Sequence, residues 1–338
     1  MHWRYVRGPI VLISLLCPLP SLHPQQSNLW RDPSPHTVQY VQVDKDVHLE
    51  VLDWGGSGRT VILLAGGGNT AHVFDGFAPK LAATCRVYGV TRRGFGTSTY
   101  LPLENGSDRL GEDVVAVIRT LKLEKPVLVG HSIAGVELSS VARLHPSSVA
   151  GLVYLDAAYP YAFDNGKGPT MRDFLELQGT GPQPPAPSQS DLANFSALQR
   201  WDTQIYGFQM PEPELRETWE STLEGRVTKQ REFPGSQMFM SIMTGSPQYA
   251  NLRVPALAIF AIPHLPETWM TKSADATVHR VADTYFRSLD LLAEKQAKAF
   301  EDGVPGARVI RVRGRHYIFL SNESDVLREM LSFLSSLK

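Results

Sequence analysis

Residues 126–135 read Pro-Val-Leu-Val-Gly-His-Ser-Ile-Ala-Gly, a short apolar run that leads into Ser132 between small residues. A helical pattern begins directly afterwards. This order predicts a strand, a sharp turn and a helix, with the Ser132 hydroxyl projecting from the turn where a base can reach it. Gly130 and Ala134 keep bulky side chains out of so tight a corner. Ser132 is therefore a candidate nucleophile.

Two further features occur where serine chemistry needs them. His316 follows the last predicted strand and so belongs to the same sheet edge as Ser132, where it can act as a general base. Residues 65–69 read Ala-Gly-Gly-Gly-Asn after the first buried strand. The backbone amides of Gly67 and Ile133 are the predicted donors to an oxyanion. Together these residues predict acyl transfer through a serine nucleophile.

With these motifs the sequence resembles the α/β-hydrolase family. The resemblance rests on four features: Gly-His-Ser-Ile-Ala at 130–134, the glycine loop at 65–69, Arg-Gly-Phe-Gly-Thr-Ser at 93–98, and His316 ahead of a terminal helix. It covers roughly residues 38–157 and 252–337. The resemblance implies that Ser132 is the nucleophile. Members that resemble epoxide hydrolases and haloalkane dehalogenases have an aspartate at the corresponding position.

The acid of the expected Ser-His-acid triad departs from the family pattern. Many members carry Asp just beyond the strand that corresponds to 256–261, whereas here His264 is near that position. Three candidate acids remain: Asp156 at the end of the preceding strand, Glu267 and Asp275. We take Asp156 as the predicted acid, because some members that resemble lipases use this position and a strand end suits the geometry. Glu267 and Asp275 stay open as alternatives.

The elements expected around these residues alternate between strands and helices. Strands are predicted at 38–43, 47–54, 60–65, 86–90, 127–129, 151–156, 254–261 and 308–312, and helices at 74–83, 108–121, 134–144, 278–300 and 325–337. Such alternation is typical of an α/β fold with a mostly parallel central sheet and helices on both faces. The block at 159–250 interrupts it with proline-rich sequence and short helical patches such as 212–223. The resemblance implies that this block is a helical cap insertion in an α/β-hydrolase fold.

The N-terminus has the pattern of an export signal. Arg4 and Arg7 precede an apolar stretch at 10–19 that is too short to span a bilayer as an ordinary helix. The expected domains are a signal peptide or N-terminal anchor at 1–24, a Pro-rich linker at 25–37, the two parts of the hydrolase core at 38–158 and 251–338, and the cap insertion at 159–250. We expect a secreted or periplasmic protein that contacts a membrane only if residues 1–24 stay uncleaved.

Charge and motif content argue against several other functions. The 33 Lys and Arg residues are balanced by 34 Asp and Glu, with no basic run, so nucleic-acid binding has no electrostatic support. The histidines lack metal-ligand spacing, and acyl transfer by serine needs no metal or organic cofactor, so none is expected. Residues 66–71 also fit a dinucleotide fingerprint, but this interpretation leaves Ser132 and His316 unexplained. Arg92 is expected to form a structural ion pair near the Ser132 turn.

The sequence as a whole predicts an exported, carboxylesterase-like serine hydrolase. It would cleave an ester or a related acyl bond of a small-molecule substrate through an acyl-enzyme. Two alternatives stay open: a non-catalytic ligand-binding protein of the same fold, and an acyltransferase. The sequence specifies neither the substrate nor the oligomeric state.

Overall fold

The computed structural model describes residues 30–100, 106–234 and 249–337. Of these, residues 34–337 form one compact unit. The predicted signal peptide or anchor at 1–24, and the first part of the predicted linker at 25–29, lie outside the described residues. Among the helices that are described, none combines the length and the apolar composition needed to cross a bilayer.

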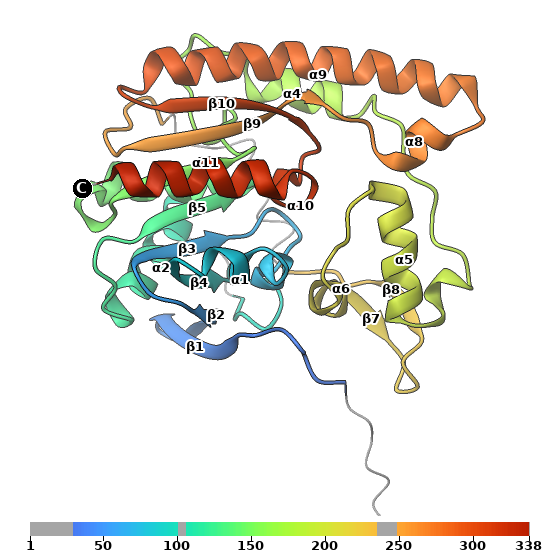
Figure 1. Cartoon of the computed structure of the whole chain (residues 1–338), viewed down its shortest axis with the longest axis horizontal. Helices are drawn as coiled ribbons and strands as arrows, with labels where there is room; N and C mark the ends of the chain where they lie inside the picture. Colours follow the sequence, from blue (N-terminus) through green and yellow to red (C-terminus); the bar gives the residue numbers. More distant parts are fainter. Residues whose placement is uncertain (1–29, 101–105, 235–248, 338) are drawn as a thin grey trace, which may run out of the picture. The chain divides into compact units, whose positions relative to one another are not determined.

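In the described part of the chain, eight strands form the central sheet in the order β1-β2-β4-β3-β5-β6-β9-β10 (Figure 1). These are β1 (Thr37–Asp44), β2 (Val47–Gly55), β3 (Arg59–Leu64), β4 (Cys85–Val90), β5 (Val127–His131), β6 (Gly151–Leu155), β9 (Ala256–His264) and β10 (Arg308–Gly314). β2 pairs antiparallel with β1 and β4, and every other neighbouring pair is parallel. The predicted α/β architecture with a mostly parallel sheet is confirmed.

Helices cover both faces of this sheet, and further helices belong to the insertion between β6 and β9 (Figure 1). They are α1 (Ala78–Leu81), α2 (Gly106–Thr120), α3 (Gly135–Leu144), α4 (Met171–Gln178), α5 (Phe195–Tyr206), α6 (Glu212–Thr218), α8 (Thr268–Lys272), α9 (Ala276–Gly303), α10 (Ile318–Ser321) and α11 (Glu323–Ser336), with short 3₁₀ helices at Ala71–Phe74, Ser132–Ala134, Pro146–Ser148 and Asp191–Ala193. In β3, Ile62 and Leu64 belong to the hydrophobic cluster on one face, and Val61 and Leu63 to the cluster on the other. A strand buried on both faces is apolar without alternation, as the sequence of β3 is.

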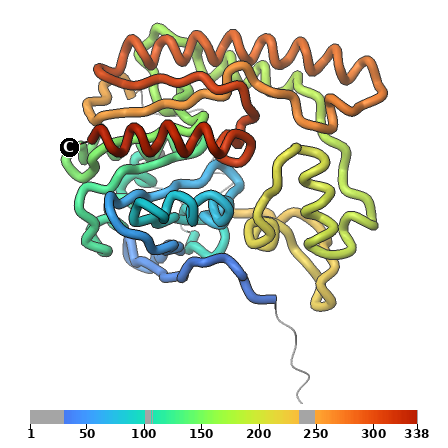
Figure 2. The backbone as a smooth tube through the Cα atoms, in the orientation of Figure 1, coloured from blue at the N-terminus to red at the C-terminus, as the bar shows by residue number. Residues whose placement is uncertain are grey.

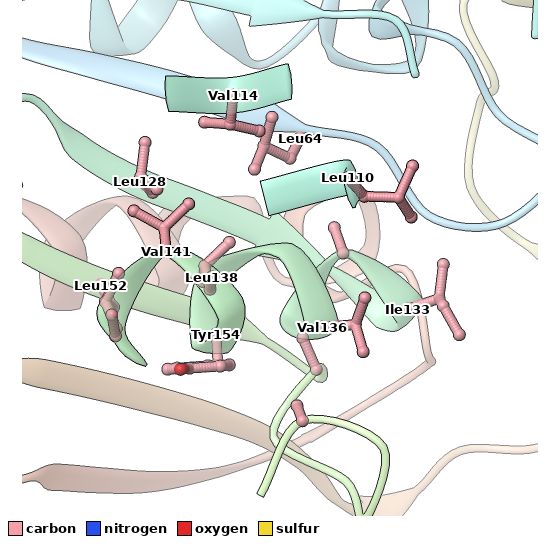
Figure 3. Close-up of a cluster of buried hydrophobic side chains, with 14 of the residues drawn as sticks. Leu64, Leu110, Val114, Leu128, Ile133, Val136, Leu138, Val141, Leu152 and Tyr154 are labelled. Atoms are coloured by element: carbon pink, nitrogen blue, oxygen red, sulfur yellow. The ribbon is translucent and has the colours of Figure 1, made fainter. Parts of the chain in front are cut away.

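The cluster on the α2–α3 face anchors the segment that follows Ser132. Leu110 and Val114 of α2 are four residues apart and present one apolar face, and they pack with Leu138 and Val141 of α3 (Figure 3). Leu128 of β5 belongs to the same cluster. Full burial of a side chain of this size contributes about 1.5–3 kcal/mol. The beginning of α3 is therefore a rigid support for the turn before it.

Two predicted helical segments differ in the structure. Over 74–83 the chain forms a 3₁₀ helix that ends at Phe74 and the four-residue α1, because Pro79 lacks an N–H group and is tolerated only in a first helical turn. Over 212–223, α6 ends at Thr218. The next residues form β7 (Trp219–Ser221), which pairs antiparallel with β8 (Val227–Gln230). The insertion therefore contains a small sheet as well as helices.

The insertion lies between two neighbouring strands of the central sheet. The chain leaves the sheet after β6, forms α4, α5, α6 and the β7–β8 hairpin, and returns to the sheet at β9 (Figure 2). Residues of α5, α6 and β7 join the hydrophobic cluster that also contains α1 and α11. The insertion is thus packed onto the core through apolar side chains.

Candidate active site

The turn after β5 gives Ser132 an unusual backbone conformation. Ser132 has a φ of 54°, in the left-handed region, and begins the 3₁₀ helix that leads into α3. This conformation costs a residue other than glycine on the order of 1–2 kcal/mol, so the surrounding packing must hold it. A Cβ atom at Gly130 would lie 2.7 Å from Leu138 Cδ1 and 3.1 Å from the carbonyl carbon of Ala134. A side chain at this position would require Leu138 and the backbone of Ala134 to shift, which glycine avoids.

The structure brings Ser132, His316 and Asp156 into one hydrogen-bonded row. Ser132 Oγ donates to His316 Nε2 at 2.9 Å, and His316 Nδ1 donates to Asp156 Oδ2 at 2.6 Å. The register of the sheet explains why two of them meet. His131 of β5 lies opposite Leu155 of β6, so Ser132 and Asp156 are the next residues at the ends of adjacent parallel strands.

Asp156 is fully buried and held by several donors. Its Oδ1 accepts hydrogen bonds from the Tyr159 hydroxyl at 2.8 Å and the Ala261 amide at 3.0 Å. Burial alone would raise the pKa of Asp156, but the hydrogen bond and the charge of His316 outweigh it, and the pKa falls to about 2. The carboxylate is therefore charged at neutral pH. It fixes the His316 proton on Nδ1 and leaves Nε2 free to accept from Ser132.

The two alternative acids occupy other positions. Glu267 lines the same cavity as Ser132, but its Oε2 is buried without a hydrogen-bond partner in the described part of the chain, and burial raises its pKa. Asp275 is exposed and caps α9, where its Oδ1 accepts from the Thr277 amide at 2.7 Å. The residue that the structure hydrogen-bonds to His316 is Asp156.

His264 lies next to Asp156 and is hydrogen-bonded to Asp290, a pair that the sequence did not link. The amide and the Nδ1 of His264 both donate to Asp290 Oδ1, at 2.8 and 2.7 Å, and His264 Nε2 lies 3.9 Å from Asp156 Oδ2. The only signal in the sequence was the occurrence of His264 near the position expected for an acid. Nothing pointed to Asp290, which lies in the middle of α9, or to Tyr159.

Arg92 holds the glycine loop in place. Its Nε and Nη2 donate to the two carboxylate oxygens of Glu137 in α3, at 2.8 and 2.7 Å. The same guanidinium donates to the carbonyls of Ala65 and Gly66, at 2.8 and 3.3 Å. Because C=O and N–H point in opposite directions in a trans peptide, the bond to the Gly66 carbonyl turns the Gly67 N–H away from Arg92. Arg92 is a structural residue, as the sequence predicted.

The glycine loop also packs directly on the serine turn. A Cβ atom at Gly66 would lie 2.7 Å from His131 Nδ1 and 3.2 Å from Ser132 Cβ. His131 is buried and donates from Nε2 to the carbonyl of His316 at 3.1 Å. Burial and the neighbouring His316 lower the pKa of His131 to about 3, so it is neutral. His131 therefore links the turn to the backbone of His316.

Glu214 of α6 ties the glycine loop to the insertion. Its carboxylate accepts from Asn69 Nδ2 at 2.9 Å, from the Thr70 amide at 3.2 Å and from Thr70 Oγ1 at 2.5 Å. The Tyr317 hydroxyl donates to Asn69 Oδ1 at 2.8 Å. The loop is thus bound both to α6 and to the residue after His316. None of these long-range contacts has a signal in the sequence.

We expect Glu214 to make the stability of the protein depend on pH. Burial raises the pKa of Glu214 from 4.5 to about 8, so between these values the folded state binds a proton more tightly than the unfolded chain. The free energy of unfolding should therefore fall as the pH rises from about 5 to about 8, by up to ~1.4 kcal/mol per pH unit for this group. Glu214→Gln should remove this part of the slope in urea unfolding measured across that range.

The exposed Glu176 of α4 provides a matched control for this measurement. Glu176→Gln should leave the slope of stability against pH unchanged. An equally steep slope in Glu214→Gln would show that Glu214 is not the group responsible.

A cavity of about 380 Å³ opens beside Ser132 and His316. Its wall is mainly apolar and comes from α4, α8 and α9, with Met171, Phe174, Leu177, Met270, Phe286 and Leu289 among its residues. Tyr159, Tyr161, His264 and Glu267 add polar groups. This size and mixture are typical of sites that bind small molecules.

Several solved structures share this fold. E-2-(acetamidomethylene)succinate hydrolase aligns with a TM-score of 0.60 at 17% identity, over 89% of this chain and 100% of that one. An esterase from Exiguobacterium antarcticum aligns with a TM-score of 0.58 at 18% identity, over 89% and 100% of the two chains. At these identities the likeness concerns the fold alone.

Sequence relatives match shorter segments. The chain is 36% identical over 124 residues to the AB hydrolase superfamily protein YisY of Bacillus subtilis. The aligned segment covers 36% of this chain and 46% of that protein. It is 33% identical over 109 residues to the esterase Rv0045c of Mycobacterium tuberculosis. This segment covers 32% of this chain and 36% of that protein. The chain thus matches less than half the length of each of these relatives. Residues 61–329 match the profile of the Alpha/beta hydrolase family, and the chain belongs to this family.

Proposed function

We propose that the protein is a serine esterase that hydrolyses carboxylic esters of small molecules. The observation that carries the proposal is the row of hydrogen bonds from Ser132 through His316 to Asp156, at 2.9 and 2.6 Å, beside an apolar cavity. The esterase Rv0045c among the sequence relatives supports an ester as the substrate class. A non-catalytic binding role was suggested by the missing acid after β9, and the position of Asp156 beside His316 speaks for an enzyme instead.

The proposed reaction has two halves. In the first, His316 Nε2 accepts the Ser132 proton as Oγ bonds to the ester carbonyl carbon, and Asp156 stabilises the imidazolium that forms. The bond from this carbon to the alcohol oxygen then breaks, and His316 passes its proton to that oxygen. In the second half His316 deprotonates a water molecule that attacks the acyl-enzyme. The acid leaves and Ser132 regains its proton.

The amides of Gly67 and Ile133 are the proposed donors to the oxyanion of each tetrahedral intermediate. Ile133 follows Ser132 directly, and Gly66 lies against Ser132 Cβ, so both amides belong to backbone that borders the nucleophile. Arg92 supports this role, because its bond to the Gly66 carbonyl fixes the orientation of the Gly67 N–H. A single donor of this kind contributes about 10²–10³ to kcat in serine hydrolases.

The insertion at 159–250 is proposed to act as a cap that completes the substrate site. Met171, Phe174 and Leu177, all in α4, supply one wall of the cavity beside Ser132, and α9 supplies another. Burial of apolar atoms contributes about 25 cal/mol per Å² of surface removed from water. An ester with an apolar substituent is therefore the substrate class that suits this cavity.

Export also stays a proposal, and it rests on the N-terminal sequence alone. We propose that residues 1–24 direct the chain to a secreted or periplasmic location. The charged start and the apolar stretch at 10–19 support this role.

A fluorophosphonate probe tests the esterase proposal. The probe should attach covalently to Ser132 of the folded protein, because only an activated serine reacts with it at an appreciable rate. Peptide mass spectrometry after labelling should locate one modified serine, and Ser132→Ala should not be labelled. Ser335→Ala, which removes an exposed serine from α11, is the matched control and should be labelled like the wild type. Folded wild-type protein that stays unlabelled would refute the proposal.

A further inference from the structure

A second cavity, of about 350 Å³, lies between the glycine loop and the insertion. Gly67 and Gly68 of the loop form part of its wall, together with Tyr317, which follows His316. Asp202 of α5 and Trp219 of β7 contribute from the insertion. The cavity therefore borders the proposed oxyanion donor on one side and the insertion on the other.

Asp202 is the unusual residue of this cavity. It is only 7% exposed, and its Oδ2 has no hydrogen-bond partner in the parts of the chain that the structure describes. Burial raises the pKa of Asp202 to about 7. A buried carboxylate without a partner is costly, and either a proton or a bound cation relieves that cost. Asp202 is thus prepared to pair with a positive charge from outside the chain.

Aromatic rings surround the same space. Tyr206 is four residues after Asp202 and lies on the same face of α5. Its ring is 6.2 Å from that of Phe208, which is 5.3 Å from that of Tyr317. Trp219 also lines the cavity. The faces of such rings attract organic cations, and the attraction grows when the cation is removed from water.

The other charged groups of the cavity already have partners. Glu214 accepts hydrogen bonds from Asn69 and Thr70. Arg231 is exposed, and its Nε donates to the backbone carbonyl of Glu217. Among the charged side chains of this wall, Asp202 is therefore the one whose geometry suits an incoming ligand.

We propose that this second cavity is a subsite for an organic cation, and that the ester substrate carries an ammonium group that pairs with Asp202. The inference rests on the proposed esterase function, because it assigns the two cavities to two parts of one substrate. The apolar part occupies the cavity beside Ser132, and the cationic part occupies the aromatic cavity beyond Gly67. Gly67 lines the aromatic cavity, and its neighbour Gly66 packs against Ser132, so the glycine loop lies between the two parts.

Two esters of equal shape test the substrate preference. The choline ester of butyric acid is compared with its neutral isostere, in which a carbon atom replaces the quaternary nitrogen. The wild type should prefer the charged ester in kcat/KM by about tenfold or more, and Asp202→Asn should abolish this preference, measured as the ratio of the two kcat/KM values. Asp283→Asn, which changes an exposed aspartate of α9, is the matched control and should keep the preference.

Binding to inactive protein separates this inference from the esterase proposal. Calorimetric titration of Ser132→Ala with tetramethylammonium should give saturable binding, and Asp202→Asn in the same background should weaken it by about tenfold or more. Binding that depends on Asp202, together with wild-type protein that hydrolyses neither ester, would uphold the cation site and refute the esterase proposal. Ester hydrolysis without a preference for the charged ester, together with no binding of tetramethylammonium, would overturn the cation site and leave the esterase intact. A preference for the neutral isostere would overturn it as well.

Discussion

Replacing Asp156 by asparagine is expected to lower kcat for ester hydrolysis by about 10⁴-fold, with little change in KM. Asparagine has the shape of aspartate and tolerates the φ of 46° found at this position, so the fold is retained. Its amide nitrogen, however, cannot accept the His316 Nδ1–H that Asp156 Oδ2 accepts at 2.6 Å. The imidazole then carries its proton on Nε2 and no longer accepts from Ser132. Steady-state hydrolysis of p-nitrophenyl esters measures the loss.

The alternative acids supply the controls for Asp156→Asn. Asp275→Asn should keep nearly full activity, because Asp275 caps α9 and is exposed. Glu267→Gln should change KM more than kcat, because Glu267 lines the cavity without a hydrogen bond to His316 among the contacts of the described chain. Full activity of Asp156→Asn, or a loss of kcat in Glu267→Gln instead, would show that the acid is assigned to the wrong residue.

Replacing Arg92 by methionine is expected to lower the free energy of unfolding by about 3–5 kcal/mol. The side chains of Arg92 and Glu137 are 5% and 4% exposed, so the substitution leaves a buried carboxylate without its partner. It also leaves the carbonyls of Ala65 and Gly66 without their donor. We expect kcat to fall in addition, since the orientation of the Gly67 amide, the proposed oxyanion donor, is no longer fixed by the bond from Arg92 to the Gly66 carbonyl. Urea unfolding measures the first effect and ester turnover the second.

A double variant separates these two roles of Arg92. Arg92→Met combined with Glu137→Met removes the unpaired charge and should recover part of the stability, but kcat should stay low because the glycine loop is still not held. Arg172→Met is the matched control: Arg172 pairs with Glu176 on α4 at 85% exposure, and such a pair contributes less than about 1 kcal/mol. Equal stability losses in Arg92→Met and Arg172→Met would contradict the structural role of Arg92.

The sequence predicted most of the sheet and the serine turn, because both depend on local patterns. The apolar strands and the amphipathic α2 have periodicities that can be read along the chain. The residues around Ser132 are constrained by close contact within a few positions, as Gly130 shows against Ala134. Local information of this kind determines which element forms and where it turns.

The choice among the acids and the architecture of the insertion depend on contacts between distant residues. The sequence favoured Asp156 but left Glu267 and Asp275 open, because the pairing of β5 with β6, which places Asp156 beside Ser132, is a property of the sheet rather than of either strand. In the insertion, the helix expected to continue to 223 ends at Thr218, because Trp219 begins a strand whose partner is β8. The contact of Glu214 with the glycine loop joins residues 145 positions apart. A sequence pattern within one segment cannot reveal a contact between two distant segments.

The bond between Glu214 and the glycine loop has a consequence for how molecules pass in and out. Lifting α6 would break the hydrogen bonds to Asn69 and Thr70 and would loosen the glycine loop, which carries the proposed oxyanion donor Gly67. We therefore expect α6 to stay in place during the reaction. The cavity beside Ser132 is lined instead by α4 among other elements, and α4 has no buried residue. We therefore expect substrate and product to pass on the α4 side, where a movement would leave the hydrogen bonds of Glu214 to the glycine loop intact.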